Sequence, residues 1–230
     1  MKKRNAFTLA EVLITLGIIG IVAAMTIPNL IYNFQERVLL IQIRKTYNNL
    51  MQAIELFKAK NETEDLSNLF SGTNTSRQTR DELAKYFKDA KVCNAGDYKC
   101  YPKYDIKKTT GRYDDNGDPL YNNIGSQETI HLGDGSIISI IQYNSCERII
   151  EGSPIYDEDK NIIGKEPDRT DNSCAQISFD VNGKKGPNVT GKDFFCLAVS
   201  KKNIIFYNSV NCGDLKSILY EDKLNETVNY

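Results

Sequence analysis

The chain has 230 residues, of which 40% are apolar and 26% charged, and its 29 basic and 30 acidic side chains leave a formal net charge of -1. This balance excludes a strongly basic nucleic-acid-binding protein and an acidic disordered tail. Because a typical domain has about 100 to 200 residues, the length allows one domain, or one domain with an appendage.

The N-terminal segment is the most hydrophobic part of the chain. Three cations, Lys2, Lys3 and Arg4, precede it, and no residue from 12 to 35 is charged. As a helix with a rise of about 1.5 Å per residue, residues 7–27 would span roughly 31 Å, about the thickness of the hydrocarbon core of a bilayer. Cationic flanks stay on the cytoplasmic side, so the rest of the chain is expected outside the cytoplasm.

Two interpretations of this segment compete. It has the basic start, the apolar stretch and the small residues near Ala24 that are typical of an ordinary secretory signal peptide. Alternatively, the apolar segment is retained as an anchor. The first interpretation does not explain Glu11, because a charge within the bilayer costs roughly 2.5 to 3.5 kcal/mol on insertion scales and needs a partner.

The residues around Glu11 form a recognisable motif. The sequence Phe7-Thr8-Leu9-Ala10-Glu11, followed by an apolar stretch that ends at Pro28, resembles the class III signal of type IV prepilins and type II secretion pseudopilins. The resemblance implies cleavage between Ala6 and Phe7 and N-methylation of Phe7. It makes Glu11 the fifth residue of the mature chain and places Pro28 where the family usually has a helix-kinking proline. One departure is Ala6, since the family usually has Gly before the cut.

The resemblance implies a structural subunit and no enzyme: a minor pilin or pseudopilin of a type IV pilus or type II secretion-like filament. Its expected partners are copies of itself, other pilin-like subunits, prepilin peptidase, an inner-membrane assembly platform and, before assembly, membrane lipid. A buried Glu11 carboxylate can neutralise the Phe7 amine of a neighbouring subunit and set the axial register. The expected location is the inner membrane, as a single-pass protein with its head outside, and then an extracytoplasmic filament. The alternative is an exported, disulfide-bonded binding domain released near Ala24.

An amphipathic pattern continues beyond Pro28. Apolar residues recur at spacings of three and four residues on one face of a helix, at Leu40, Ile43, Tyr47, Leu50, Ile54 and Phe57. This stripe predicts that the second half of the helix packs on the globular head, and Pro28 is expected to bend or locally melt the helix. The predicted organisation is a leader at 1–6, a transmembrane and polymerisation helix at 7–28, an amphipathic helix at 29–60 and a globular head at 61–230.

The head is predicted to be an antiparallel sheet covered by the amphipathic helix, which gives an α+β, type IV pilin-like fold. Gly133-Asp134-Gly135 predicts a hairpin. Residues 91–123 are expected to form a long loop, and Thr79 or Asp81 to cap a short helix. The expected strands are residues 129–132, 137–143, 177–181, 194–199 and 204–207, and the expected short helices are residues 66–70 and 81–87.

Six cysteines lie in the part of the chain that is expected outside the cytoplasm. An even count in that location indicates disulfides, although fifteen pairings are possible. Proximity along the chain favours Cys93 with Cys100, Cys146 with Cys174 and Cys196 with Cys212. A zinc site is the competing interpretation, but the sequence has no Cys-x-x-Cys spacing and its one histidine, His131, lies in a predicted strand.

The segment 180–194 is dense in turn-forming residues and resembles a loop found in pilin-like secretion proteins, with D-x-N-G, K-G-P-N and G-x-D-x-F elements. Asp180, Asn182 and Asp193 could bring oxygen ligands together around calcium. Equally, their side chains could cap turns by hydrogen bonds to the backbone. Calcium is the one cofactor that the sequence suggests.

Motifs for catalysis are missing from the sequence, which has no G-x-S-x-G, Walker A, dinucleotide-binding or H-E-x-x-H pattern. His131 alternates with apolar neighbours and is interpreted as a surface strand residue. The lysine pairs at 184–185 and 201–202 are isolated, so the basic density is too low to predict nucleic-acid binding.

Overall fold

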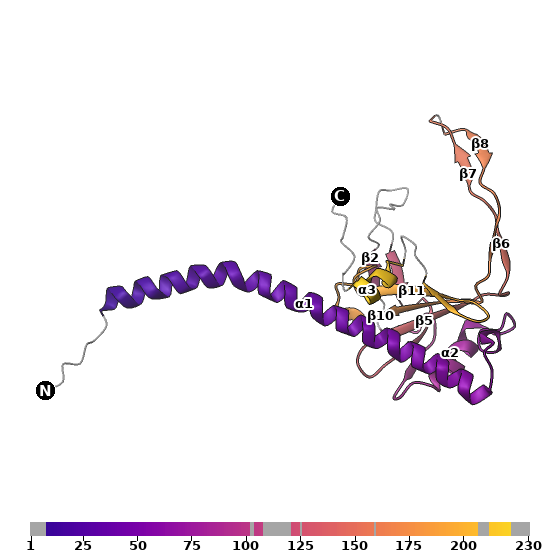
Figure 1. Cartoon of the computed structure of the whole chain (residues 1–230), viewed down its shortest axis with the longest axis horizontal. Helices are drawn as coiled ribbons and strands as arrows, with labels where there is room; N and C mark the ends of the chain where they lie inside the picture. Colours follow the sequence, from indigo (N-terminus) through magenta and orange to yellow (C-terminus); the bar gives the residue numbers. More distant parts are fainter. Residues whose placement is uncertain are drawn as a thin grey trace.

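The computed structural model describes residues 8–101, 104–107, 121–124, 126–158, 160–206 and 212–221. One long helix, α1, extends far beyond a head that contains the strands, so that only its C-terminal part lies against the sheet (Figure 1). A narrow two-stranded arm carries β6, β7 and β8 away from the head, on the side opposite to the free half of α1.

Helix α1 runs from Leu9 to Asn61 and divides into two halves of different environment. Its first buried residue is Ile43, and the buried face continues through Leu50 and Ile54 to Phe57. The two remaining members of the predicted stripe, Leu40 and Tyr47, are partly buried and pack against the same core. The predicted amphipathic half is therefore confirmed.

Pro28 lies inside α1, and the helix continues through it without interruption. Local melting of the helix at this proline was therefore a wrong expectation. A proline in a helix removes one hydrogen bond and clashes with the preceding turn, which a helix can accommodate by bending. Figure 1 shows that the free half of α1 is curved, as a bend would require.

A six-stranded antiparallel sheet forms the centre of the head, with the strand order β1-β4-β5-β10-β11-β12. The longest strands, β5, β10 and β11, lie next to one another and are almost entirely buried. Their apolar side chains pack against the buried face of α1 in one core. The strands are β1 Lys91–Cys93, β4 Glu128–His131, β5 Ile137–Gln142, β10 Ala175–Asp180, β11 Phe194–Val199 and β12 Ile204–Phe206.

The remaining elements are short and lie around this sheet. Strands β2 and β3 pair with each other, as do β6 with β9 and β7 with β8. They are η1 Leu66–Asn68, α2 Ser76–Ala84, β2 Tyr104–Lys107, β3 Tyr121–Ile124, β6 Arg148–Ile150, β7 Pro154–Tyr156, β8 Ile162–Lys165, β9 Arg169–Asp171, η2 Gly183–Lys185 and α3 Leu215–Glu221.

The five predicted strands are present, with bounds that differ by one or two residues. The helix predicted at 81–87 is wrong in position, since α2 begins at Ser76 and its N-cap is Thr75. The cause is a capping box in which the Thr75 hydroxyl accepts from the Gln78 N–H while the Gln78 side chain accepts from the Thr75 N–H.

The long loop predicted at 91–123 is also wrong, because the segment contains β1, β2 and the first residues of β3. Tyr104 and Ile106 are buried while Asp105 and Lys107 between and after them are exposed. This alternation is typical of a strand with one covered face. The strand is only four residues long, so its alternation is a weak signal in the sequence.

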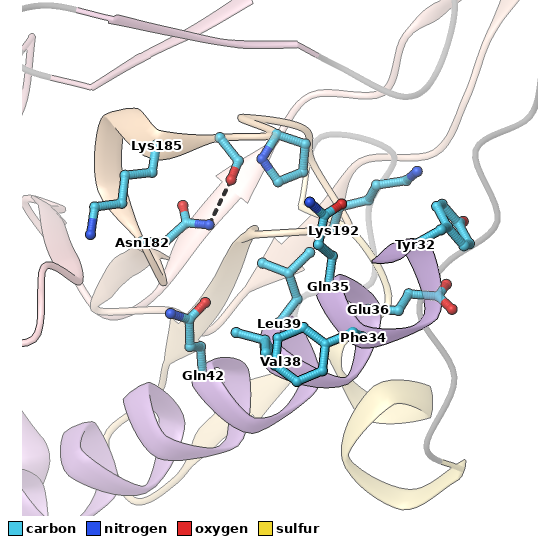
Figure 2. A pocket seen from close by; sticks show the side chains of 12 residues that line it. Tyr32, Phe34, Gln35, Glu36, Val38, Leu39, Gln42, Asn182, Lys185 and Lys192 are labelled. Atoms are coloured by element: carbon cyan, nitrogen blue, oxygen red, sulfur yellow. Dashed lines mark hydrogen bonds between the residues drawn. The ribbon is translucent and has the colours of Figure 1, made fainter. Parts of the chain in front are cut away.

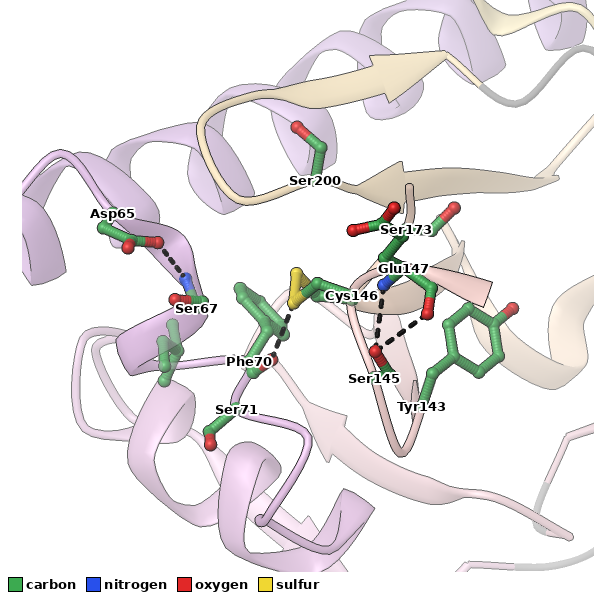
Figure 3. The surroundings of a disulfide bond; sticks show 12 residues. Asp65, Ser67, Phe70, Ser71, Tyr143, Ser145, Cys146, Glu147, Ser173 and Ser200 are labelled. Carbon is green, nitrogen blue, oxygen red and sulfur yellow. Dashed lines mark hydrogen bonds between the residues drawn. A yellow bond between two sulfur atoms is a disulfide. The ribbon is translucent and has the colours of Figure 1, made fainter. Parts of the chain in front are cut away.

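Three disulfides join the cysteines in the pairs that chain proximity favours. They are Cys93 with Cys100, Cys146 with Cys174 and Cys196 with Cys212. The second of them joins the two chain segments at the base of the arm, beside the segment that contains Phe70 and Ser71 (Figure 3). The third ties β11 to the segment that leads into α3.

Candidate assembly site on the N-terminal helix

The start of α1 is organised around Glu11. Thr8 is the N-cap, and its hydroxyl accepts a hydrogen bond from the Glu11 N–H at 3.2 Å. In return, Glu11 Oε2 accepts from the Thr8 N–H at 2.8 Å and from the Thr8 hydroxyl at 2.9 Å. This reciprocal capping box satisfies N–H groups that have no partner within the helix, and it holds the carboxylate at the positive end of the helix dipole.

Sequence reasoning missed this role of Thr8. The signal was available, since Thr-x-x-Glu directly before an apolar run is the sequence signature of a capping box. The consequence is that Glu11 is oriented toward the N-terminus of the chain before any partner binds. Ala6 and Phe7, the residues on either side of the expected cleavage point, lie outside the described residues.

The half of α1 that precedes the head exposes an unusual amount of apolar surface. Leu9 is 79% exposed, and all of the large apolar side chains up to Phe34 are at least 42% exposed. This helix is long and apolar enough to cross a membrane, with a mean hydropathy of 2.2 in its most apolar window, none of which is buried. Soluble monomers rarely expose apolar surface on this scale, so the helix requires lipid or other helices around it.

If the chain assembles with similar helices, we expect six apolar side chains of α1 to pack against the neighbouring helices. All six are among the exposed residues. A face that can contact lipid before assembly can contact equally apolar helices afterwards, because the side chains are the same. These six are Leu9, Val12, Leu13, Leu16, Ile19 and Ile21.

The loop that follows β10 brings Asp180 and Asp193 close to many backbone donors. Asp180 Oδ1 accepts from the N–H groups of Asn182 and Gly183, and its Oδ2 accepts from the Tyr104 hydroxyl at 2.8 Å. Asp193 accepts from the N–H groups of Asn188 and Val189, each at 2.7 Å. Both carboxylates therefore cap the turns of the loop, which is the alternative to a calcium site.

Asn182, the third residue expected to bind calcium, does not accept hydrogen bonds from the loop as the two carboxylates do. Asn182 donates from Nδ2 to the Gly186 carbonyl at 2.7 Å, and its Oδ1 is buried without a hydrogen-bond partner. Within the residues that the structure describes, no group of three His, Cys, Asp or Glu side chains is arranged to hold a metal ion. Because N–H donors already point at the carboxylates, the geometry favours turn capping, and calcium binding stays a prediction.

Burial determines the ionisation of these two carboxyls. Loss of solvent, with the nearby Asp193 charge, raises the pKa of Asp180 to about 7. Burial likewise raises the pKa of Asp193. A carboxyl whose pKa is higher in the folded than in the unfolded chain binds more protons when folded, so its contribution to stability is lost as the pH rises toward its folded value.

We therefore expect Asp180→Asn to change the pH dependence of stability. Between pH 4 and pH 7 the free energy of unfolding of the wild type should fall relative to that of the variant, by at least about 2 kcal/mol, since one pKa unit is worth about 1.4 kcal/mol. Urea unfolding of the full chain in detergent at a series of pH values measures this difference. Parallel curves for the two proteins would show that Asp180 titrates normally.

His131 lies at the end of β4 and is half buried, so the expectation of a surface residue was wrong in part. Its ring packs on the Tyr101 ring with 4.4 Å between centroids, and its Nε2 lies 3.0 Å from the Thr129 hydroxyl. Burial and the neighbouring Lys91 charge lower its pKa to about 4. The imidazole is therefore neutral at physiological pH and serves as a packing residue.

Comparison with known families identifies the N-terminal motif. Residues 1–27 match the family model of the prokaryotic N-terminal methylation motif. The chain thus carries the prepilin-type signal of type IV pilins and pseudopilins, and its long apolar helix followed by a mostly antiparallel sheet is an α+β layout that matches a pilin-like fold. No curated protein and no solved structure matches the chain.

Proposed function

We propose that the chain is a structural subunit, a minor pilin or pseudopilin, of a type IV pilus or a type II secretion-like filament. The observation that carries the proposal is the apolar half of α1, which is exposed along its whole length and begins with a capped carboxylate at Glu11. Such a helix is stable in lipid and in a bundle of similar helices, but its apolar surface is unfavourable in water. The large head, expected at residues 61–230, favours a minor subunit.

Processing would separate the leader at 1–6 from the helix and create a new amine on Phe7, which is then methylated. In a filament, the Glu11 carboxylate of one subunit would neutralise the Phe7 amine of its neighbour. An axial shift of one helix would separate the two charges and leave each buried without a partner, which is strongly destabilising. The pair can therefore specify one axial position of the helix.

The contact between neighbouring helices would join two different surfaces, since Glu11 and Phe7 of a pair come from different subunits. A heterologous contact of this kind does not close on itself and generates a helical filament. Copies of this chain and other pilin-like subunits would be the partners, together with prepilin peptidase and an inner-membrane assembly platform. The segments 7–28, 29–60 and 61–230 would then serve as anchor, connector and surface domain.

The alternative, release by an ordinary signal peptidase near Ala24, fits the helix poorly. A cut there falls within an uninterrupted turn of α1 and leaves apolar residues on the released domain. Met25 would remain 72% exposed, as would Leu30 and Phe34 at similar levels. A water-soluble binding domain would expose this apolar surface to water, whereas a membrane-anchored subunit uses it to contact lipid.

The location of the chain in cells tests the proposal. An antibody against the head should label the membrane fraction and, after mechanical shearing, filaments that sediment as polymers. The antibody should also decorate filaments in electron micrographs. A head that is found only as a soluble monomer in the medium or periplasm would contradict a filament subunit and support the released domain.

A further inference from the structure

The arm, defined as residues 147–173 between Cys146 and Cys174, extends away from the core of the head (Figure 1). It consists of two short ribbons in succession, β6 with β9 and β7 with β8. Its base is held by the disulfide (Figure 3). An ion pair between Arg148 and Asp171 also joins the two chain segments there. Gly152 lets the two chains approach closely, because a Cβ there would lie 1.8 Å from the Glu166 carbonyl oxygen.

The arm exposes several large apolar side chains. Outside α1, nine large apolar side chains of the described residues are exposed, and five of them are in the arm. Tyr156 and Ile162 are direct cross-strand neighbours in the outer ribbon, 56% and 67% exposed. An isolated two-stranded ribbon is marginally stable in water, so this pair indicates a surface that is covered in the assembled protein. The five are Ile149, Ile155, Tyr156, Ile162 and Ile163.

The arm is also acidic. Residues 147–173 contain eight acidic and four basic side chains. The described residues that follow Tyr156 in its outer ribbon include Asp157 and Glu158. A partner for this tip must therefore offer both apolar surface and positive charge.

A groove with these two properties lies where α1 leaves the sheet. It has a volume of about 530 Å³ and lies between the helix and the loop after β10. Its apolar lining includes Phe34, Val38 and Leu39 from the helix and Pro187 from the loop, which also contributes Lys185 and Lys192 (Figure 2).

The charge of the groove complements that of the arm. The loop at 181–192 has three lysines and no acidic residue, and Glu36 is the acidic residue among those that line the groove. The two carboxylates that flank the loop, Asp180 and Asp193, are fully buried and point at backbone donors. The loop therefore presents its lysines to an incoming chain.

The arm and the groove lie at opposite ends of the sheet. Strand β10 begins one residue after Cys174, where the arm ends, and it ends at Asp180, where the loop begins. Because a six-residue strand is about 20 Å long, the base of the arm and the groove are separated by about this distance. The arm of one chain therefore does not reach its own groove. In a polymer of parallel subunits, the arm end of one head faces the groove end of the next.

We infer that the tip of the arm docks in the groove of a second copy of this chain. Tyr156 and Ile162 contact the apolar wall formed by α1, and Asp157 and Glu158 lie near Lys185 and Lys192. The contact joins unlike surfaces and thus extends the polymer in the same direction as the helix contact. This inference rests on the proposed filament, and it concerns the positions in that filament where two copies of this chain are neighbours.

Photo-crosslinking in cells that make the full chain tests the inference. With p-benzoylphenylalanine in place of Tyr156, irradiation should give a covalent dimer of this chain, linked to residues 30–39 or 181–192. The matched control places the same group at Tyr220, which is 75% exposed in α3 and outside the arm. The control should give no link to these two segments.

Charge reversal makes the test specific. Lys185→Glu with Lys192→Glu should lower the yield of the Tyr156 crosslink by about fivefold or more, and adding Glu158→Lys should restore part of it. A Tyr156 crosslink to a different protein or a different surface, or no dimer in assembled filaments, would overturn the inference. Filaments with a processed N-terminus but without this crosslink would leave the proposed function intact, whereas a chain without filaments would refute both.

Discussion

Replacing Arg80 by Met should lower the free energy of unfolding by about 3 to 5 kcal/mol, the range measured when one partner of a buried ion pair is removed. Arg80 in α2 is 2% exposed. Its guanidinium contacts the Glu128 carboxylate of β4 and donates to the Cys93 carbonyl of β1 at 2.7 Å. It also donates to Asp81 at 2.7 Å. One side chain therefore joins α2 to two strands, and its loss removes a donor from the Cys93 carbonyl and one of the two arginines that contact Glu128.

Arg77 provides a matched control, because its Nε contacts the same carboxylate of Glu128 at 3.2 Å while its side chain is 55% exposed. Arg77→Met should cost less than about 1 kcal/mol, as exposed ion pairs do. The double variant Arg80→Met with Glu128→Leu should be more stable than Arg80→Met alone, since it removes a buried carboxylate that keeps only the exposed Arg77 as its partner. Urea unfolding followed by near-ultraviolet circular dichroism of the tyrosines measures all three. Equal effects of the two arginine substitutions would contradict the role assigned to Arg80.

The second large effect is expected from Glu11→Leu, which should leave the chain in the membrane but reduce its incorporation into filaments more than tenfold. Leucine is favourable in lipid, so membrane insertion is preserved. In the filament, however, the Phe7 amine of the neighbouring subunit would be buried without its counter-charge, at a cost of several kcal/mol, and each 1.4 kcal/mol is about tenfold in an equilibrium. Quantitative immunoblots of membrane and sheared filament fractions measure the partition.

Two further variants separate charge from helix capping. Glu11→Gln keeps an oxygen that accepts from the Thr8 N–H, so it preserves the cap but removes the charge. It should fail to assemble as Glu11→Leu does. Glu55→Leu makes the same change on the same helix at a side chain that is 69% exposed and paired with Lys58, and it should assemble normally. Normal filaments from Glu11→Gln would contradict the charge-pairing account.

Features that depend on neighbouring residues could be predicted from the sequence. The apolar stripe from Leu40 to Phe57 repeats at helical spacing, and the hairpin at Gly133-Asp134-Gly135 has a strong turn signature, so both are found in the structure. The three disulfides also follow the chain order of the cysteines. The motif around Glu11 identifies the N-terminal signal because residue type, spacing and charge coincide there.

Other features depend on contacts between distant residues or on very short strands. Arg80 and Glu128 are 48 positions apart, and no local pattern links them. The strands of the arm are three or four residues long, and the segments between them contain Gly152 and Pro167, so they lack the length that makes alternation visible. The start of α2 could have been found, because Thr75 and Gln78 have the spacing of a capping box.

The N-terminus of the mature chain tests the central claim most directly. Mass spectrometry of the N-terminal peptide from purified filaments or membranes should show a chain that begins with N-methylated Phe7. Cleavage there removes three cations from 29, so 26 basic groups would remain against 30 acidic ones and the mature side-chain charge would be about -4. A mature chain that begins at Met25 would contradict the account and identify an exported domain in place of a filament subunit.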